Sequence, residues 1–177
     1  MKKIFFPLAI AATILFSAFT VYTATTWKIA EGYSIKFTSD DPAGVFSSFK
    51  GDIAFDANDL GGSKFDVTID VNSINMGNGM KNSKAKNENW FNAAKYPSIK
   101  FTSSKITKTA TGYEAVGTLD MKGVQKPLTI PFTFANNTFT GSFSINRIDY
   151  GVGTDKGMDS HASSILKVDV SVPVTKG

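Results

Sequence analysis

Apolar and polar residues alternate along most of the chain, most clearly at residues 64–71. There the odd positions from Phe65 to Val71 are apolar, and the even positions carry Lys, Asp or Thr. Side chains of a strand point alternately to its two faces, whereas a helix would spread these residues around its circumference. The same alternation occurs at 33–38, 52–56, 98–102, 113–121, 128–135, 139–145 and 166–175. The pattern predicts about eight strands, as in an all-β sandwich or barrel.

The breaks between these stretches carry residues that favour tight turns. They are Asp41-Pro42, Gly61-Gly62, Thr111-Gly112, Lys122-Gly123 and Asn136-Asn137. Such short connections favour hairpins, and hairpins pair antiparallel. Pro131 and Pro173 fall inside two alternating stretches. Because proline has no amide hydrogen to donate to a ladder, we expect both at bulges, strand ends or exposed edges.

Two stretches depart from the alternation. Residues 72–96 are polar, and their part from Lys81 to Ala94 contains neither Pro nor Gly. We expect a short helix there, laid as a lid over one end of the barrel, with Trp90 and Phe91 as its buried anchors. Residues 151–164 carry three glycines, and we expect a long mobile loop.

The N-terminal residues have the form of a secretory signal peptide. Two lysines after Met1 precede an apolar run from Ile4 to Phe19, which is slightly short for a membrane span of about 20 residues. We therefore expect a signal peptide at residues 1–24, a single domain at residues 25–177, and a periplasmic or secreted protein. The large Tyr22 is not ideal before a cleavage site at Ala24, so an uncleaved N-terminal anchor is the alternative.

Composition excludes several classes of chemistry. The chain has no cysteine, so disulfides, thiol catalysis and Cys-ligated metals are excluded. The formal net charge is +4, two units of which come from Lys2 and Lys3, and no block of like charges marks a nucleic-acid-binding surface. We expect no cofactor and no nucleic-acid partner.

Candidate catalytic and metal-binding residues are few. His161, the one histidine, follows Asp159 and Ser160, but three adjacent loop residues do not supply the convergence that a nucleophilic triad needs. Residues 56–61 resemble the start of a calcium loop but lack its later ligands. A turn in which Asp and Asn side chains bond their own backbone is the preferred interpretation, and we expect no metal site.

Charged residues near the expected lid suggest contacts for a ligand's polar end. Arg147 and Asp149 are expected on one face of a strand end, where they pair with each other on the surface or contact a polar head group. The lid lysines form either a solvated helix face or a surface that makes transient contact with anionic membrane lipid; they are Lys81, Lys84, Lys86 and Lys95.

Five segments in this order resemble the YceI-like family of exported polyisoprenoid-binding barrels. They are Trp27-Lys28-Ile29 with Ser34-Ile35-Lys36-Phe37, then Phe49 to Asp56, Trp90-Phe91-Asn92 with Tyr96 to Phe101, Gly117 to Pro127, and Asn146 to Gly151. The resemblance implies an eight-stranded antiparallel, lipocalin-like β-barrel with an isoprenoid tail along its bore, a periplasmic setting and frequent homodimers. Two departures concern the family's polar contacts. Tyr33 stands where the family carries His, and Lys81 to Ala85 replace its Arg-Asp-x-His-Leu.

We therefore expect the inner face of the strands, with the two lid aromatics, to bind an apolar isoprenoid-like lipid without catalysis. Small residues on the inner row from Tyr113 to Gly117 are expected to leave room for it. Three alternatives stay open: a ligand-free structural barrel, a lipid-modifying enzyme, and an outer-membrane barrel, against which the charges of Lys64, Asp66 and Asp70 argue. The expected wall residues are Phe65, Ile69, Trp90, Phe91, Phe101, Leu119, Phe132, Phe143 and Val170.

Overall fold

Eight strands pair side by side into a closed ring in the computed structural model, which describes residues 24–154 and 162–177. Every pairing is antiparallel, and the ring closes because β1 pairs with both β4 and β11. In spatial order the strands are β1 (Thr26–Ile29), β4 (Phe49–Ala54), β5 (Lys64–Asp70), β7 (Ser98–Lys108), β8 (Tyr113–Met121), β9 (Val124–Ala135), β10 (Thr138–Asn146) and β11 (Ile165–Lys176). The expected eight-stranded antiparallel barrel is confirmed.

The last strand changes partner along its length. Residues 174–176 of β11 pair with β1, and residues 167–171 pair with β2 (Ser34–Thr38). Pro173 lies between these stretches, so its missing amide hydrogen falls where the partner changes. Two short strands that the sequence pattern did not predict, β3 (Gly44–Phe46) and β6 (Ile74–Asn75), continue the sheet beyond β2.

Two of the expected turns close two-residue hairpins in the left-handed conformation. Lys122 and Gly123 have φ angles of 54° and 76° between β8 and β9, and Asn136 and Asn137 have φ angles of 50° and 54° between β9 and β10. Turns of this kind match the right-handed twist of the strands that they join. Gly and Asn adopt positive φ at low cost, so these pairs set the strand register.

Apolar rows face the bore and polar rows face outward. In β7, Ile99 and Phe101 are buried while their neighbours Ser98 and Lys100 are exposed. On the outside, the Lys100 ammonium lies 3.0 Å from the Asp66 carboxylate of the next strand. This polarity is the reverse of that of a membrane-spanning barrel, whose apolar side chains face lipid.

An aromatic cluster packs one end of the barrel, which we call the floor. Phe55 is 1% exposed and forms its centre. Five rings lie with their centroids 5.0–6.4 Å from that of Phe55: Phe65, Tyr113, Phe132, Phe134 and Phe139. Most of these contacts are edge-to-face, the geometry that aromatic quadrupoles favour.

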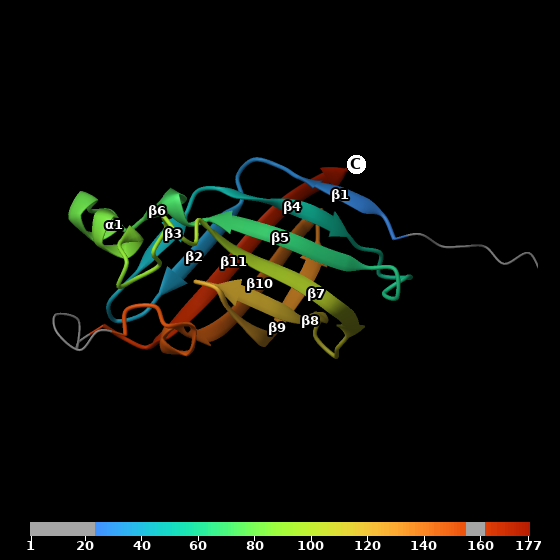
Figure 1. Ribbon diagram of the computed structural model, residues 1–177. Coiled ribbons are helices and arrows are strands. Elements are labelled where there is room, and N and C mark those ends of the chain that lie inside the picture. The colour runs from blue at the N-terminus through green and yellow to red at the C-terminus, as the bar shows by residue number, and fades with distance from the viewer. Residues whose placement is uncertain (1–23, 155–161) are drawn as a thin grey trace, which may run out of the picture.

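A lid covers the opposite end (Figure 1). It consists of α1 (Gly79–Lys86) and residues 87–97. The 3₁₀ turn η1 (Val71–Ser73) precedes it in the chain, and a second 3₁₀ turn, η2 (Arg147–Tyr150), contacts it through Arg147 and Trp90. The short helix expected within residues 72–96 is present, and it begins two residues before Lys81 and ends at Lys86. The side chain of Asn78 caps its start, and the side chain of Asn87 accepts bonds from the amides of Asn89 and Trp90 and so begins a new turn.

Candidate functional site

Two apolar cavities lie inside the barrel. The lid cavity, of about 90 Å³, is bounded by the lid and the upper strands, and its wall exposes only apolar atoms. The floor cavity, of about 130 Å³, extends toward the aromatic cluster, and its wall is almost entirely apolar. An apolar cavity of about 150 Å³ holds one benzene molecule. Each cavity thus has room for roughly one small hydrocarbon group as it stands.

A ring of six side chains, which we call the waist, separates and borders both cavities. They come from six different strands and are Ile35, Ile69, Ile99, Leu119, Phe143 and Val168. The shared residues show that the two cavities adjoin. Because the cavities measure only about 90 and 130 Å³, a chain-like molecule would have to displace side chains of the wall to occupy both. Phe143 and Ile69 are half-buried, whereas the other four waist residues are buried.

The nine apolar residues expected from the sequence all lie on the walls of these cavities. Trp90 and Phe91 line the lid cavity and are each 9% exposed, as expected of buried anchors. Ile69, Leu119 and Phe143 line both cavities, and the remaining four line the floor cavity: Phe65, Phe101, Phe132 and Val170. Their contact with a ligand stays a prediction.

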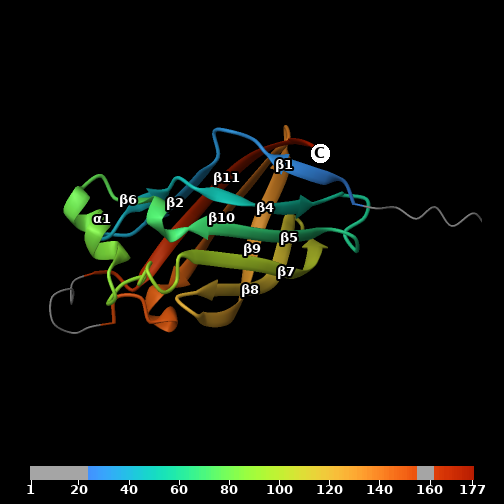
Figure 2. The ribbon, with the colours of Figure 1, turned by 45° about the horizontal axis from the view of Figure 1, so that its top comes forward.

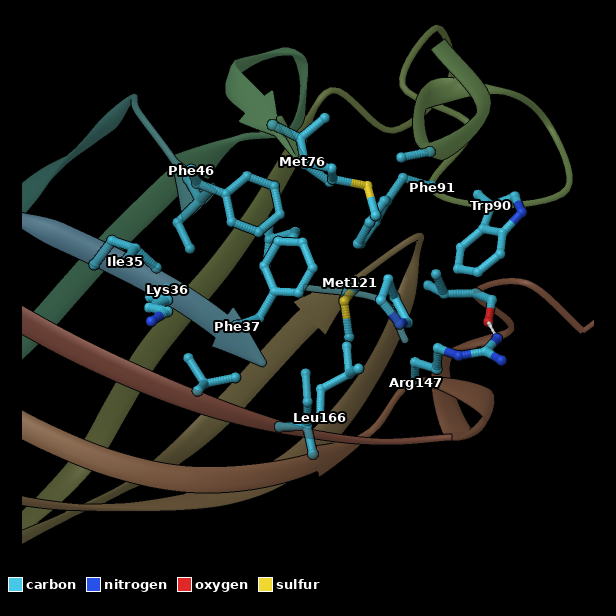
Figure 3. A pocket seen from close by; sticks show the side chains of 18 of the residues that line it. Ile35, Lys36, Phe37, Phe46, Met76, Trp90, Phe91, Met121, Arg147 and Leu166 are labelled. Atoms are coloured by element: carbon cyan, nitrogen blue, oxygen red, sulfur yellow. Dashed lines mark hydrogen bonds between the residues drawn. The ribbon is translucent and has the colours of Figure 1, made fainter. Parts of the chain in front are cut away.

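The lid cavity also has walls that were not among the nine expected wall residues. Figure 3 shows Phe37, Phe46 and Met76 pointing into it from the β2–β3 edge and from the chain before α1. Ile35 and Phe37 follow the alternating row and could have been chosen on that basis. Met76 lies outside any alternating stretch, so no sequence pattern marked it as a wall residue.

One detail of the expected bore is wrong. The row from Tyr113 to Gly117 was expected to leave space, but the space beside Gly117 is filled by its neighbours. A Cβ atom on Gly117 would lie 2.8 Å from the Phe101 ring and 2.3 Å from the carbonyl oxygen of Thr102. The glycine therefore serves close packing between β7 and β8 and not ligand space.

Arg147 is buried and its guanidinium binds backbone oxygen. The residue is 3% exposed. To other described residues its side chain donates four hydrogen bonds of 2.7–2.8 Å, and its guanidinium lies 4.9 Å from the centre of the Trp90 ring (Figure 3). The accepting carbonyls belong to Val152, Gly153, Ala162 and Ser163.

The structure thus corrects the expected roles of Arg147 and Asp149. They do not share a face of a strand end, because both belong to the 3₁₀ turn η2, which turns one inward and the other outward. Asp149 is exposed, and its carboxylate accepts a bond from the side-chain amide of Asn146. With four carbonyls and an aromatic ring around it, Arg147 connects the lid to neighbouring segments, and it also borders the lid cavity. Contact of either residue with a ligand's head group stays a prediction.

The expected mobile loop at 151–164 is also partly wrong. Val152 is 1% exposed, and the carbonyls of residues 152, 153, 162 and 163 are bound to Arg147. The two ends of this stretch are therefore attached to the barrel. Gly157 and His161, with Asp159 and Ser160, lie outside the described residues.

A shallow opening beside the lid is lined by charged side chains from the lid and from the β2–β3 connection. It is lined in part by Asp41, Lys81, Lys84 and Trp90, and adjoins the lid cavity. The Lys81 ammonium lies 3.3 Å from the Asp41 carboxylate, and both side chains are more than half exposed. Such an exposed pair contributes little to stability.

Tyr33, at the position where the family carries His, joins two elements. Its hydroxyl donates to the carbonyl of Ser47 at 2.9 Å and accepts a bond from the amide of Phe49 at 3.2 Å. It therefore holds the start of β4 against the start of β2, and this is a structural role.

The interpretation of residues 56–61 as a turn agrees with the structure. The Asp56 carboxylate accepts a bond from the amide of Asn58, and the Asp59 carboxylate accepts one from the amide of Gly62. In the described part of the chain, no three acidic or histidine side chains gather as a metal site would require. Across residues 24–154 and 162–177, no helix is long and apolar enough to cross a bilayer.

Comparison with known proteins places this barrel in a family. A UPF0312 protein of Yersinia enterocolitica is 28% identical over 133 residues, which make up 70% of this chain and 69% of the relative. The crystal structure of Burkholderia cenocepacia BcnA covers 81% of this chain and 96% of its own, with 29% identity and a TM-score of 0.74. A polyisoprenoid binding domain from Saccharophagus degradans shares the fold at 17% identity, with a TM-score of 0.61 over 88% of this chain and 100% of its own. The YceI-like domain model matches residues 14–175, and the chain therefore belongs to the YceI-like family.

Proposed function

We propose that this protein binds an isoprenoid-like lipid in its bore, as a carrier or sequestering protein of the periplasm. The observation that carries the proposal is the continuous apolar wall of the two cavities that share the waist. Burying one isoprene unit is worth about 3–4 kcal/mol at roughly 0.8 kcal/mol per methylene-sized group. The burial of a few isoprene units is thus enough for strong binding, before the entropic cost of ordering the lipid chain is subtracted.

Two further observations support binding over catalysis. The described residues that line the two cavities include no carboxylate and no imidazole. Lys36 borders the lid cavity, but the residue is exposed and the cavity wall presents only apolar atoms. The Saccharophagus degradans structure with the same fold is described as a polyisoprenoid binding domain. At 17% identity that likeness concerns the fold, and the ligand class is carried over here as part of the proposal.

The purified protein should release a lipid on denaturation. Native mass spectrometry is expected to show a mass above that of the bare chain, and denaturing mass spectrometry is expected to identify the excess as a quinone or polyprenyl compound. Self-association measured in the same experiment would decide whether the family's homodimer forms here. Transient contact with a membrane surface, through which a carrier loads, belongs to the same proposal.

A ligand-free barrel is the second candidate, and the size of the cavities favours it. Ligand pockets usually measure about 300–1,000 Å³, whereas these cavities are about 90 and 130 Å³. An isoprenoid chain requires the waist to open. A bare mass, with no lipid taken up after incubation with quinones or prenyl compounds, would support the filled barrel and contradict the lipid proposal.

Replacing Phe143 by Asp is expected to reduce lipid content at least tenfold. Covering a carboxylate with hydrocarbon costs several kcal/mol, and each 1.4 kcal/mol is tenfold in affinity. Phe143 is the better test residue, because Phe132 belongs to the packed floor and its replacement by Asp would unfold the barrel. Phe143→Leu is the matched control and should keep its lipid. A folded Phe143→Asp protein with normal lipid content would show that the ligand does not contact this wall.

A further inference from the structure

The barrel wall has a gap in its hydrogen bonding between two neighbouring strands. β9 and β10 pair only next to their shared turn, where residues 132–135 face residues 138–141. Residues 124–131 of β9 and residues 142–146 of β10 have no partner on that side. We call this unpaired stretch the window, and Figure 2 shows the two strands running apart from their common turn.

Two prolines explain why the window does not close. In a two-residue hairpin the residues that flank the turn exchange hydrogen bonds, and further bonded pairs follow at every second residue. Counted from Ala135 and Thr138, the bonded pairs after Thr133–Thr140 would be Pro131–Ser142, Thr129–Ser144 and Pro127–Asn146, so prolines stand at the first and third of them. Neither proline has an amide hydrogen to donate, so the ladder ends before Pro131.

The window has defined ends and borders the floor cavity. Its base is the last strand pair, Phe132 with Gly141. At its other end the Lys122 ammonium, on the β8–β9 turn, donates a 2.7 Å hydrogen bond to the carbonyl of Gly151. Leu128 and Ile130 on one side and Phe143 on the other are half-buried and line the floor cavity.

Lys126 stands on the inner row at this window. It pairs with Leu119, which lines both cavities, and it interrupts the inner row between Val124 and Leu128. It is the one charged residue of β9 and β10 together. Among the described residues Lys126 makes neither a hydrogen bond nor an ion pair within bonding distance.

The chemistry of this arrangement suits an amphiphile. A lysine extends its apolar stem along hydrocarbon and keeps its ammonium in water, so Lys126 can place a positive charge at the outer edge of an apolar cavity. A compact ammonium binds phosphate as a point charge. At the lid opening, by contrast, the ammonium of Lys81 already faces the carboxylate of Asp41.

We propose that the window holds the polar end of the bound lipid, that this end is anionic, as in a prenyl phosphate, and that Lys126 is its counter-charge. The proposal rests on the lipid binding proposed above and specifies the head group and where it lies. The tail then occupies the floor cavity and passes the waist, and the lid closes the far end of the bore without contacting the head.

The test compares two ligands that share a tail, geranylgeranyl phosphate and geranylgeraniol. Binding to the wild-type protein is measured by calorimetry alongside Lys126→Glu, Lys126→Arg and the lid control Lys81→Glu. Because Lys126→Glu removes a charge-assisted hydrogen bond to the phosphate, we expect the affinity for geranylgeranyl phosphate to fall by about 10- to 100-fold. Alcohol binding should change less than about twofold. Lys126→Arg should retain phosphate binding, and Lys81→Glu should alter it by less than about threefold. Thermal unfolding of each variant checks that the barrel is intact.

Three results would overturn the window assignment. They are unchanged phosphate binding by Lys126→Glu, an equal loss for both ligands, and a larger loss in Lys81→Glu than in Lys126→Glu. Failure of the lipid proposal itself has a different signature, because the wild-type protein would then bind neither the phosphate nor the alcohol.

Discussion

Replacing Phe55 by alanine is expected to lower the free energy of unfolding by about 3–5 kcal/mol, as is typical of Phe→Ala in a packed core. The side chain is 1% exposed and contacts five aromatic rings, so its loss leaves a cavity that the surrounding strands cannot close. The ring cluster also joins strands from both halves of the chain, from β4 to β10. Urea unfolding at equilibrium measures the change.

Phe143→Ala is the matched control for Phe55→Ala. Phe143 is half-buried beside the window, and its loss should cost clearly less than that of Phe55. A loss below about 1.5 kcal/mol for Phe55→Ala would contradict a close-packed floor. In that case the floor end of the bore, rather than the wall beside the window, would be the part that rearranges more easily around a ligand.

Replacing Arg147 by methionine is expected to lower the free energy of unfolding by about 3 kcal/mol or more, because hydrogen bonds to a charged group contribute about 1.5–3 kcal/mol each. Methionine keeps an apolar stem of similar length but donates nothing to the carbonyls of Val152, Gly153, Ala162 and Ser163. We also expect faster amide hydrogen exchange at residues 151–154 and 162–164, because Arg147 joins these two segments.

Two companion variants separate the structural role of Arg147 from a role in ligand binding. Arg147→Lys should be intermediate in stability, since one ammonium does not reproduce a planar guanidinium fork. Asp149→Ala, at an exposed position of the same turn, should change stability by less than about 0.5 kcal/mol. A stable Arg147→Met protein, together with loss of lipid binding in Asp149→Ala, would restore the head-group role first expected of this pair.

Lipid binding in this barrel would require movement. The cavities of about 90 and 130 Å³ meet at a waist of closely placed side chains, so an isoprenoid tail must displace some of them. The half-buried residues beside the window, Leu128, Ile130 and Phe143, line the floor cavity directly. We expect them to be the side chains that reorient when a ligand enters.

The strand pattern and the turns were accessible from the chain alone. Alternation at residues 64–71 and 98–102 placed Phe65, Phe101 and their neighbours on one face, because the strand period of two needs no tertiary information. The turns at Lys122-Gly123 and Asn136-Asn137 were equally local, since positive φ angles favour glycine and asparagine. The nine expected wall residues followed from this alternation and from the two lid aromatics.

The lid was harder to predict, because its structure depends on capping and on distant contacts. The bounds of α1 follow the side chains of Asn78 and Asn87, which compete for backbone groups in ways that composition does not reveal. The orientation of Arg147 depends on carbonyls up to sixteen residues away and on Trp90, which is far from it in sequence. Neither partner could be identified from the residues around Arg147.

The sequence by itself determined the all-β class, the two faces of each alternating strand, and, through the family resemblance, the eight-stranded barrel. Of the eight alternating stretches, the one at 33–38 became β2 outside the ring, and β1 (Thr26–Ile29) in the ring was not among them. The period of two and the turn residues depend on neighbouring residues only, so strands and turns can be predicted from them without knowledge of the fold. The tertiary structure alone decided how much space is left inside, because small differences in packing, such as Phe101 against Gly117, determine whether a bore is filled. It also decided where the wall opens: Pro127 and Pro131 break a ladder only because β10 is the neighbour that would have required their missing hydrogens.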